Sequence, residues 1–149
     1  MEKRFETFTI LISKINRCIQ KLKSEEMSEF NLKTSHVSCL YYLYKNNNQL
    51  TAKELCDACD EDKAAISRAI KYLETEGFLA CESKTEKRYK SPLSLTEKGK
   101  LAAEKLSQKV DKYVELASAG ISEKDREIFY NGLILIADNL QKICDEFDN

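Results

Sequence analysis

The sequence predicts a mainly α-helical fold with one small β-hairpin. Only one proline and four glycines occur in 149 residues, which favours long helices joined by few loops. Apolar residues recur at spacings of three and four in several segments, as they do in helices that bury one face. Between residues 78 and 95, two short apolar runs instead flank a charged stretch, which is the pattern of a hairpin. The 42% share of hydrophobic residues is enough for the core of one domain.

Two long helices are expected near the ends of the chain, because apolar residues recur there at heptad-like spacing. The first seam comprises Phe5, Phe8, Ile12, Ile15, Ile19 and Leu22. The last helix begins at a cap formed by Ser122 and Asp125. Its seam comprises Phe129, Leu133, Ile136, Leu140, Ile143 and Phe147.

The apolar face of the last helix is wider than one partner helix needs, because Ile128 and Leu135 extend it. We therefore expect a second subunit to cover this face, with packing inside the monomer as the alternative. The residues expected at the subunit interface are Phe8, Ile12, Ile15, Phe129, Leu133, Ile136, Leu140 and Ile143.

Two further helices are expected between these seams. The segment TSHVSCLYYLY forms one. The other runs from Thr96 to Ala119 and would connect the subunit interface to the hairpin. Its apolar face comprises Ala102, Leu106, Val110, Tyr113 and Ala117.

The middle of the chain predicts two short helices joined by a tight turn. Residues 51–54 read Thr-Ala-Lys-Glu, which is a capping box for the first of them. Its buried stripe comprises Ala52, Leu55, Cys56 and Cys59. Asp62 is the expected N-cap of the second helix, and Gly77 is its expected C-terminal stop.

The second short helix has two contrasting faces. At 100° per residue, the side that enters the core comprises Ile66, Ala69, Ile70 and Leu73. The opposite side comprises Ala64, Ser67, Arg68 and Lys71. Small residues permit close approach to a duplex, and cations supply hydrogen-bond donors to bases and phosphates. An ordinary solvated helix face is the plainer interpretation.

A hairpin follows, with strands expected at 78–81 and 91–95. Pro92 lacks an amide donor and therefore fits an edge strand. The segment ESKTEKRYK between the strands carries the cations Lys84, Lys87, Arg88 and Lys90. A helix, a turn, a second helix and a charged hairpin follow one another in a winged helix-turn-helix, whose second helix enters a DNA groove.

The order of elements resembles the MarR family of bacterial transcriptional regulators, as do the segments ISRAIKYLETEGF and, after the basic hairpin, LSLTEKG. The resemblance covers nearly the whole chain. It implies a winged helix-turn-helix domain at residues 31–96, and a helical dimerisation region at 1–30 and 97–149. It also implies a homodimeric repressor of a pseudo-palindromic operator in double-stranded DNA.

By this resemblance, the second short helix lies in the major groove and the hairpin, or wing, in the minor groove. The residues facing the major groove would be Lys63, Ala64, Ala65, Ser67, Arg68 and Lys71. Arg88 would be the wing arginine, with Lys84, Lys87 and Lys90 beside it. The family often has Asp-x-Arg in the wing, whereas this chain has Glu86-Lys87-Arg88.

The resemblance also implies a small-molecule effector that enters a crevice between the dimer helices and the DNA-reading domain, and releases the DNA. The expected lining comprises Ile15, Cys18, Ile19, His36, Cys39, Leu40 and Tyr113. His36 is a candidate for binding an effector carboxylate, although a histidine whose hydrogen bonds are satisfied within its helix is the more common case.

Cys56 and Cys59 form a C-x-x-C, which opens the alternative of a thiol- or metal-sensing regulator. Both cysteines fall on a buried stripe near a helix C-terminus and beside acidic residues, where thiol pKa values are not lowered. With one histidine and no second C-x-x-C, a structural zinc site has little support, and no cofactor is expected.

Other classes of protein find little support in the sequence. It holds no glycine-rich phosphate loop and no spaced catalytic triad, so we do not expect an enzyme. A winged helix that binds protein would show apolar anchors where this chain has Ser67, Arg68 and Lys71. No apolar run approaches the ~20 residues of a membrane helix, and the start of the chain does not resemble a signal peptide. We therefore expect a cytoplasmic protein with no membrane partner.

Overall fold

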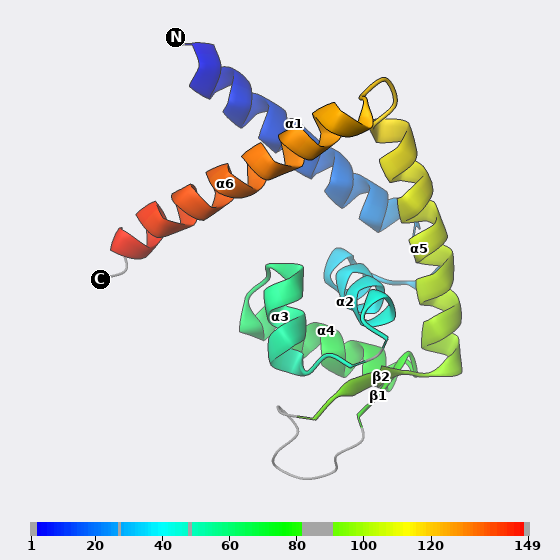
Figure 1. Cartoon of the computed structure of the whole chain (residues 1–149). Coiled ribbons are helices and arrows are strands. Elements are labelled where there is room, and N and C mark those ends of the chain that lie inside the picture. The colour runs from blue at the N-terminus through cyan, green and yellow to red at the C-terminus, as the bar shows by residue number, and fades with distance from the viewer. Residues whose placement is uncertain (1–2, 27, 48, 82–90, 148–149) are drawn as a thin grey trace. The chain divides into compact units, whose positions relative to one another are not determined.

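The computed structural model describes residues 3–26, 28–47, 49–81 and 91–147. Within these ranges the fold is mainly helical with a two-stranded antiparallel hairpin, which confirms the predicted class (Figure 1). The elements are α1 (Lys3–Glu26), the short 3-10 helix η1 (Ser28–Phe30), α2 (Thr34–Lys45), α3 (Ala52–Cys59), α4 (Lys63–Thr75), β1 (Leu79–Cys81), β2 (Leu93–Leu95), α5 (Glu97–Ala117) and α6 (Glu123–Phe147).

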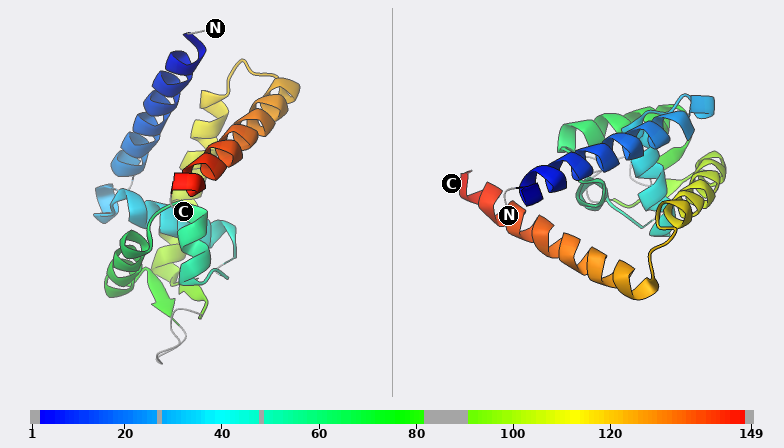
Figure 2. Two further views of the ribbon diagram at one scale, coloured as in Figure 1. Left: turned by 90° about the vertical axis from the view of Figure 1, so that its left-hand side faces the viewer. Right: turned by 90° about the horizontal axis from the view of Figure 1, so that it is seen from above.

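The chain divides into two compact units, residues 1–109 and residues 110–149, so the division falls within α5. In the first unit, helices α2, α3 and α4 group together with the hairpin at their edge (Figure 2). Each helix turns an apolar face inward, and the side chains of this core are almost completely shielded from solvent. They include Val37, Leu40, Leu43, Leu55, Ile66, Leu73 and Phe78.

The caps predicted for α3 and α4 are confirmed. Thr51 Oγ1 accepts from the Glu54 backbone N–H at 3.3 Å, and Glu54 Oε2 accepts from the Thr51 N–H at 2.8 Å. Asp62 Oδ1 accepts from the Ala65 N–H at 2.8 Å. Gly77 follows α4 with φ of 76°, a left-handed conformation that glycine adopts without a steric cost. Local side-chain chemistry thus fixes both ends of α4.

The hairpin is shorter than the sequence predicts. Its register pairs Leu79 with Leu95 and Cys81 with Leu93. The first strand begins after Phe78 because the Phe78 N–H donates to the Leu73 carbonyl at 2.8 Å, closing the end of α4. The predicted wing cations Lys84, Lys87, Arg88 and Lys90 lie outside the described residues.

The start of α5 is fixed against the end of α4. Thr96 Oγ1 donates to the Gly77 carbonyl at 2.6 Å and accepts from the Gly99 N–H at 3.1 Å. A Cβ atom at Gly99 would lie 2.0 Å from the Phe78 carbonyl oxygen, so only glycine fits there. The segment LTEKG therefore joins β2, α4 and α5.

The long helices at the ends of the chain expose apolar side chains. On α1, Ile12, Ile15, Ile19 and Leu22 are each exposed. No residue described in α6 is buried, and Phe129 and Ile143 are about half exposed. Among the described residues, no helix has the combined length and apolarity that crossing a bilayer requires.

Candidate nucleic-acid interface

Helix α4 presents the narrow exposed face that the sequence predicts. Ile66, Ala69 and Leu73 are buried on its inner side, and Ile70 is half-buried. The outer residues Lys63, Ala64, Ser67, Arg68 and Lys71 are exposed, and Ala65 is half-buried. The helix therefore has a fixed inner side and an outer side that is open to a partner.

The chemistry of the outer side suits a polyanion. Within the part of the chain that the structure describes, Arg68 and Lys71 have no ion-pair partner. Ala64 and Ser67 stand beside them and carry no bulky side chain, so a flat or grooved surface can approach closely. Guanidinium and ammonium donors next to small residues can reach both base edges and phosphates.

The N-terminal end of α4 is held through the turn that precedes it. Ser35 on α2 donates from Oγ to Glu61 Oε2 at 2.6 Å, and the Cys56 thiol on α3 donates to the Glu61 carbonyl at 2.9 Å. These two bonds join the α3–α4 turn to both preceding helices. The start of α4 is thus positioned by side chains in addition to the core.

The C-terminal end of α4 is held by α5. Lys98 Nζ donates to the Glu76 carbonyl at 2.7 Å, and the same ammonium lies 4.2 Å from the centroid of the Phe78 ring. A cation near the last carbonyls of a helix is favourable because the helix dipole is negative there. The end of α4 is therefore stabilised both by the hydrogen bond from Lys98 and by the favourable position of its positive charge.

The last turn of α4 contacts the first turn of α2 and the residue Asn31 ahead of it. The Tyr72 ring stacks on the His36 ring at 4.3 Å between centroids, and Tyr72 Oη donates to the Asn31 carbonyl at 3.0 Å. His36 is buried, and its Nδ1 accepts from the Lys33 N–H at 3.0 Å. One ring nitrogen of His36 is thus satisfied by the backbone at the start of its own helix.

Two comparisons of sequence identify the family. A model of the MarR family matches residues 30–88. The uncharacterized HTH-type transcriptional regulator YwoH of Bacillus subtilis (strain 168) is 30% identical over 122 residues, which span 80% of this chain and 88% of that protein. The chain belongs to the MarR family. As a MarR-family protein it is a transcriptional regulator and not an enzyme, in agreement with the motifs of its sequence.

Solved structures share this MarR fold. The Staphylococcus aureus MepR–DNA complex superposes with a TM-score of 0.79 at 17% identity, covering 92% of this chain and 99% of that one. Staphylococcus aureus MarR in complex with salicylate and kanamycin gives a TM-score of 0.77 at 22% identity, covering 95% of each chain. Both likenesses concern the fold.

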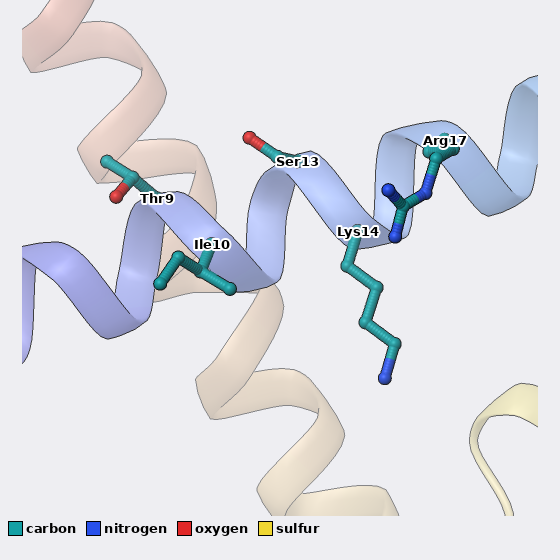
Figure 3. A pocket seen from close by; sticks show the side chains of 5 residues that line it. All are labelled: Thr9, Ile10, Ser13, Lys14 and Arg17. Carbon is teal, nitrogen blue, oxygen red and sulfur yellow. The ribbon is translucent and has the colours of Figure 1, made fainter.

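The residues expected to line the effector crevice of this MarR-family chain occupy different environments. Ile15, Cys18 and Ile19 are exposed on α1, whereas His36, Cys39 and Leu40 are buried within α2. Tyr113 is half-buried and belongs to the second unit. A shallow hollow on α1 has a different lining, namely Thr9, Ile10, Ser13, Lys14 and Arg17, all from one helix (Figure 3).

Cys56 and Cys59 on α3 do not pair with each other, because Cys59 has a cysteine from another helix as its partner. Cys59 is hydrogen-bonded to Cys39 on α2, and this bond lowers the pKa of Cys59 and, together with burial, raises that of Cys39. Burial and the nearby Asp57 raise the pKa of Cys56. The expectation that neither thiol pKa is lowered is therefore wrong for Cys59, because its partner comes from another helix. No group of three or more metal-binding side chains gathers within the described ranges.

Sequence reasoning missed the side chains that hold α4 in place. Ser35 meets Glu61 across 26 residues, and Tyr72 meets Asn31 across 41. Tyr72 falls beside the apolar stripe of α4, so helical periodicity gave no reason to select it. The one feature that could have pointed to Tyr72 is the presence of a large aromatic residue on the polar side of the helix.

Proposed function

We propose that this chain is a homodimeric repressor that binds a pseudo-palindromic operator through α4 and leaves it when a small molecule binds. The exposed cationic face of α4, set on a buried and capped helix, carries this proposal. The Staphylococcus aureus MepR–DNA complex, which shares the fold, supports it. The residues proposed to face the major groove are Lys63, Ala64, Ala65, Ser67, Arg68 and Lys71.

The proposed wing contact adds Arg88, with Lys84, Lys87 and Lys90 near it. Arginine in a minor groove reads its width and its negative potential, so the wing would add affinity with limited sequence information. These four residues come from the sequence alone.

Dimer formation is proposed from the uncovered apolar seams. Ile12 and Ile15 on α1, and Ile136, Leu140 and Ile143 on α6, are exposed to water in the single chain. Soluble monomers rarely leave so many large apolar side chains in line, and a second copy would bury them. Two copies of α4 would then meet half-sites about one helical turn, ~34 Å, apart.

Release by an effector follows from this arrangement. A ligand that binds one spacing of the two α4 helices better than another shifts the population toward the spacing it prefers. Staphylococcus aureus MarR, whose solved complex contains salicylate and kanamycin, supports a small organic ligand. The effector lining proposed from the sequence is Ile15, Cys18, Ile19, His36, Cys39, Leu40 and Tyr113.

Sedimentation velocity tests both the stoichiometry of the complex and its release by a ligand. The probe is a fluorescent duplex with the DNA sequence that lies upstream of the gene for this chain. We expect two protein chains per duplex, and loss of the complex on adding salicylate as the first ligand. One chain per duplex would contradict the dimeric arrangement. A complex that survives salicylate and a panel of other aromatic acids would contradict release by this class of ligand.

A further inference from the structure

A stacked pair of rings joins α4 to the first turn of α2. The planes of His36 and Tyr72 differ by only 4°, with 4.3 Å between ring centroids. The Tyr72 hydroxyl donates to the Asn31 carbonyl at 3.0 Å, just ahead of α2. Tyr72 is therefore fixed at both its face and its tip.

Because of where Tyr72 lies on α4, its contact with α2 affects the placement of the outer face of the helix. Arg68 precedes Tyr72 by four residues, so the two side chains are neighbours one turn apart on the helix surface. Arg68 is exposed and Tyr72 is half-buried. A shift of Tyr72 against α2 would therefore rotate or tilt the turn that carries Arg68.

His36 can make its contacts only while Nδ1 carries no proton. Nδ1 accepts from the Lys33 N–H at 3.0 Å, and a protonated Nδ1 would turn a second donor toward that N–H. The side chain of His36 is buried, so water cannot readily take the place of the lost acceptor.

The charged and titratable groups near His36 come from its own helix start and from the elements packed against α2. Burial and the nearby Lys33 lower the pKa of His36, and Glu61 from the α3–α4 turn raises it. Tyr72 from α4 covers the ring, and Lys23 from α1 donates to Ser38 two residues further along α2. A lowered pKa means that the folded arrangement is disfavoured as the pH falls below about 6.5, the ordinary value for histidine.

We propose that His36 and Tyr72 are positioning residues that hold α4 in the orientation that DNA reading requires, and that His36 does so as a neutral imidazole. This inference rests on the DNA-binding function proposed above. Acidification would loosen α4 from α2 and weaken binding to the operator, although neither His36 nor Tyr72 is among the residues proposed to face the major groove.

A pH profile of a non-titrating variant tests the inference. His36→Asn keeps an acceptor near the Lys33 N–H but has neither the ring nor the titration. The chain has one histidine, so a midrange pH effect that His36→Asn removes belongs to His36. Affinity for the upstream duplex is measured between about pH 5.5 and 7.5, the range in which histidine titrates.

We expect wild-type affinity to fall about three- to tenfold as the pH is lowered across this range. The reason is that an aromatic pair contributes a free energy that corresponds to about this factor in an equilibrium constant. His36→Asn should bind more weakly than wild type at the higher pH and should change little with pH. The same pH dependence in both proteins would overturn the inference.

Tyr72 provides a second, matched comparison at the higher pH. Tyr72→Phe keeps the stacking and loses the bond to Asn31, whereas Tyr72→Leu loses both. We expect a graded loss of affinity, smaller for phenylalanine. Tyr44→Phe on α2 makes the same chemical change away from the contact and should bind as wild type. Equal affinity of wild type and Tyr72→Leu would overturn the inference.

Amide hydrogen exchange without DNA separates this inference from the DNA-binding proposal. Protection factors across residues 63–75 should fall in wild type at the lower pH, and should be pH-independent in His36→Asn. If wild type binds no duplex, the function proposal fails while the exchange result still decides whether the pair holds α4. Unchanged protection in wild type would overturn the inference.

Discussion

Arg68 is the side chain on which sequence reading by α4 should depend most. It lies one turn before Tyr72 on α4 and is exposed, so its guanidinium is accessible. An arginine that forms a bidentate contact with a base typically contributes about 1 to 3 kcal/mol of discrimination. A phosphate contact, in contrast, contributes equally to every sequence.

We predict that Arg68→Ala lowers discrimination between the native duplex and a scrambled one by about 1 to 3 kcal/mol. Competition binding with both duplexes measures this difference. Lys53→Ala, on the exposed side of α3, removes one positive charge away from the proposed contact face and serves as the control. Equal discrimination by Arg68→Ala and wild type would show that another residue reads the bases.

The thiols should react in an order set by their surroundings. Cys59 receives a hydrogen bond from Cys39, which lowers the pKa of Cys59, whereas burial and Asp57 raise the pKa of Cys56. Since the thiolate is the nucleophile, we predict that iodoacetamide labels Cys59 faster than Cys56 near neutral pH, and labels the buried Cys39 more slowly than either.

Peptide mapping by mass spectrometry after timed alkylation measures these rates in the folded protein. Labelling in denaturant is the control, because the three thiols should then react alike. Faster labelling of Cys56 than of Cys59 in the folded protein would contradict the assigned hydrogen bond.

At the scale of elements, the junction of β2, α4 and α5 depends on Gly99. A methyl group there would meet the Phe78 carbonyl oxygen at 2.0 Å. Because that oxygen is also the acceptor for the Thr96 N–H at 3.0 Å, it cannot move without loss of a second contact. The end of α4 and the start of α5 would have to separate.

We predict that Gly99→Ala lowers the free energy of unfolding by about 2 kcal/mol or more, in the range found for overpacked cores. Gly132→Ala in α6 is the matched control, since nothing lies within 4 Å of its Cβ position and alanine favours helix. Urea unfolding monitored by circular dichroism compares the two. Similar effects of both substitutions would contradict the packing at Gly99.

The elements that the sequence predicts are those with local causes. The caps at Thr51 and Asp62 and the stop at Gly77 are contacts within a few residues, so they can be identified from sequence and were confirmed. The 3-10 helix at Ser28–Phe30 has no such marker and was missed. The His36–Tyr72 stack was missed because it joins helices far apart in the chain.

The candidate site, too, was predicted only where its features are local in sequence. Helical periodicity separates the outer residues of α4 from the inner ones, because both sets follow the 3.6-residue turn. The pKa of Cys59 could not be predicted, because Cys39 approaches it from α2 and the sequence carries no sign of that neighbour. Tertiary neighbours, and not local pattern, decide such chemistry.

At the scale of the whole molecule, the proposed binding to an operator needs a second copy of the chain. The apolar seam of α6 includes Ile136, Leu140 and Ile143, which are 40%, 48% and 50% exposed. Fully burying such a side chain from water contributes about 1.5 to 3 kcal/mol, and because these are about half exposed, each would add roughly half of that. An interface that covers both seams would sum many such contributions and would be stable. Two copies of α4 in the proposed dimer would also match the two halves of a palindromic site.

We predict that Leu140→Glu converts the dimer to a monomer at micromolar concentration and abolishes tight operator binding, because a carboxylate would be buried without a partner. Sedimentation equilibrium gives the oligomeric state. Leu101→Glu on α5 places the same charge at a similarly exposed leucine, 56% exposed, outside either seam and should remain dimeric. A dimeric Leu140→Glu would show that α6 is not at the interface.

The most direct test of the central claim is fluorescence anisotropy of the purified chain with a duplex from its own upstream region and with a scrambled duplex, over several salt concentrations. We expect tighter binding to the native duplex than to the scrambled one, and a fall in affinity for both as the salt concentration rises. Equal, weak binding to the native and scrambled duplexes, and to further duplexes tiled across the neighbouring genes, would contradict sequence-specific DNA binding.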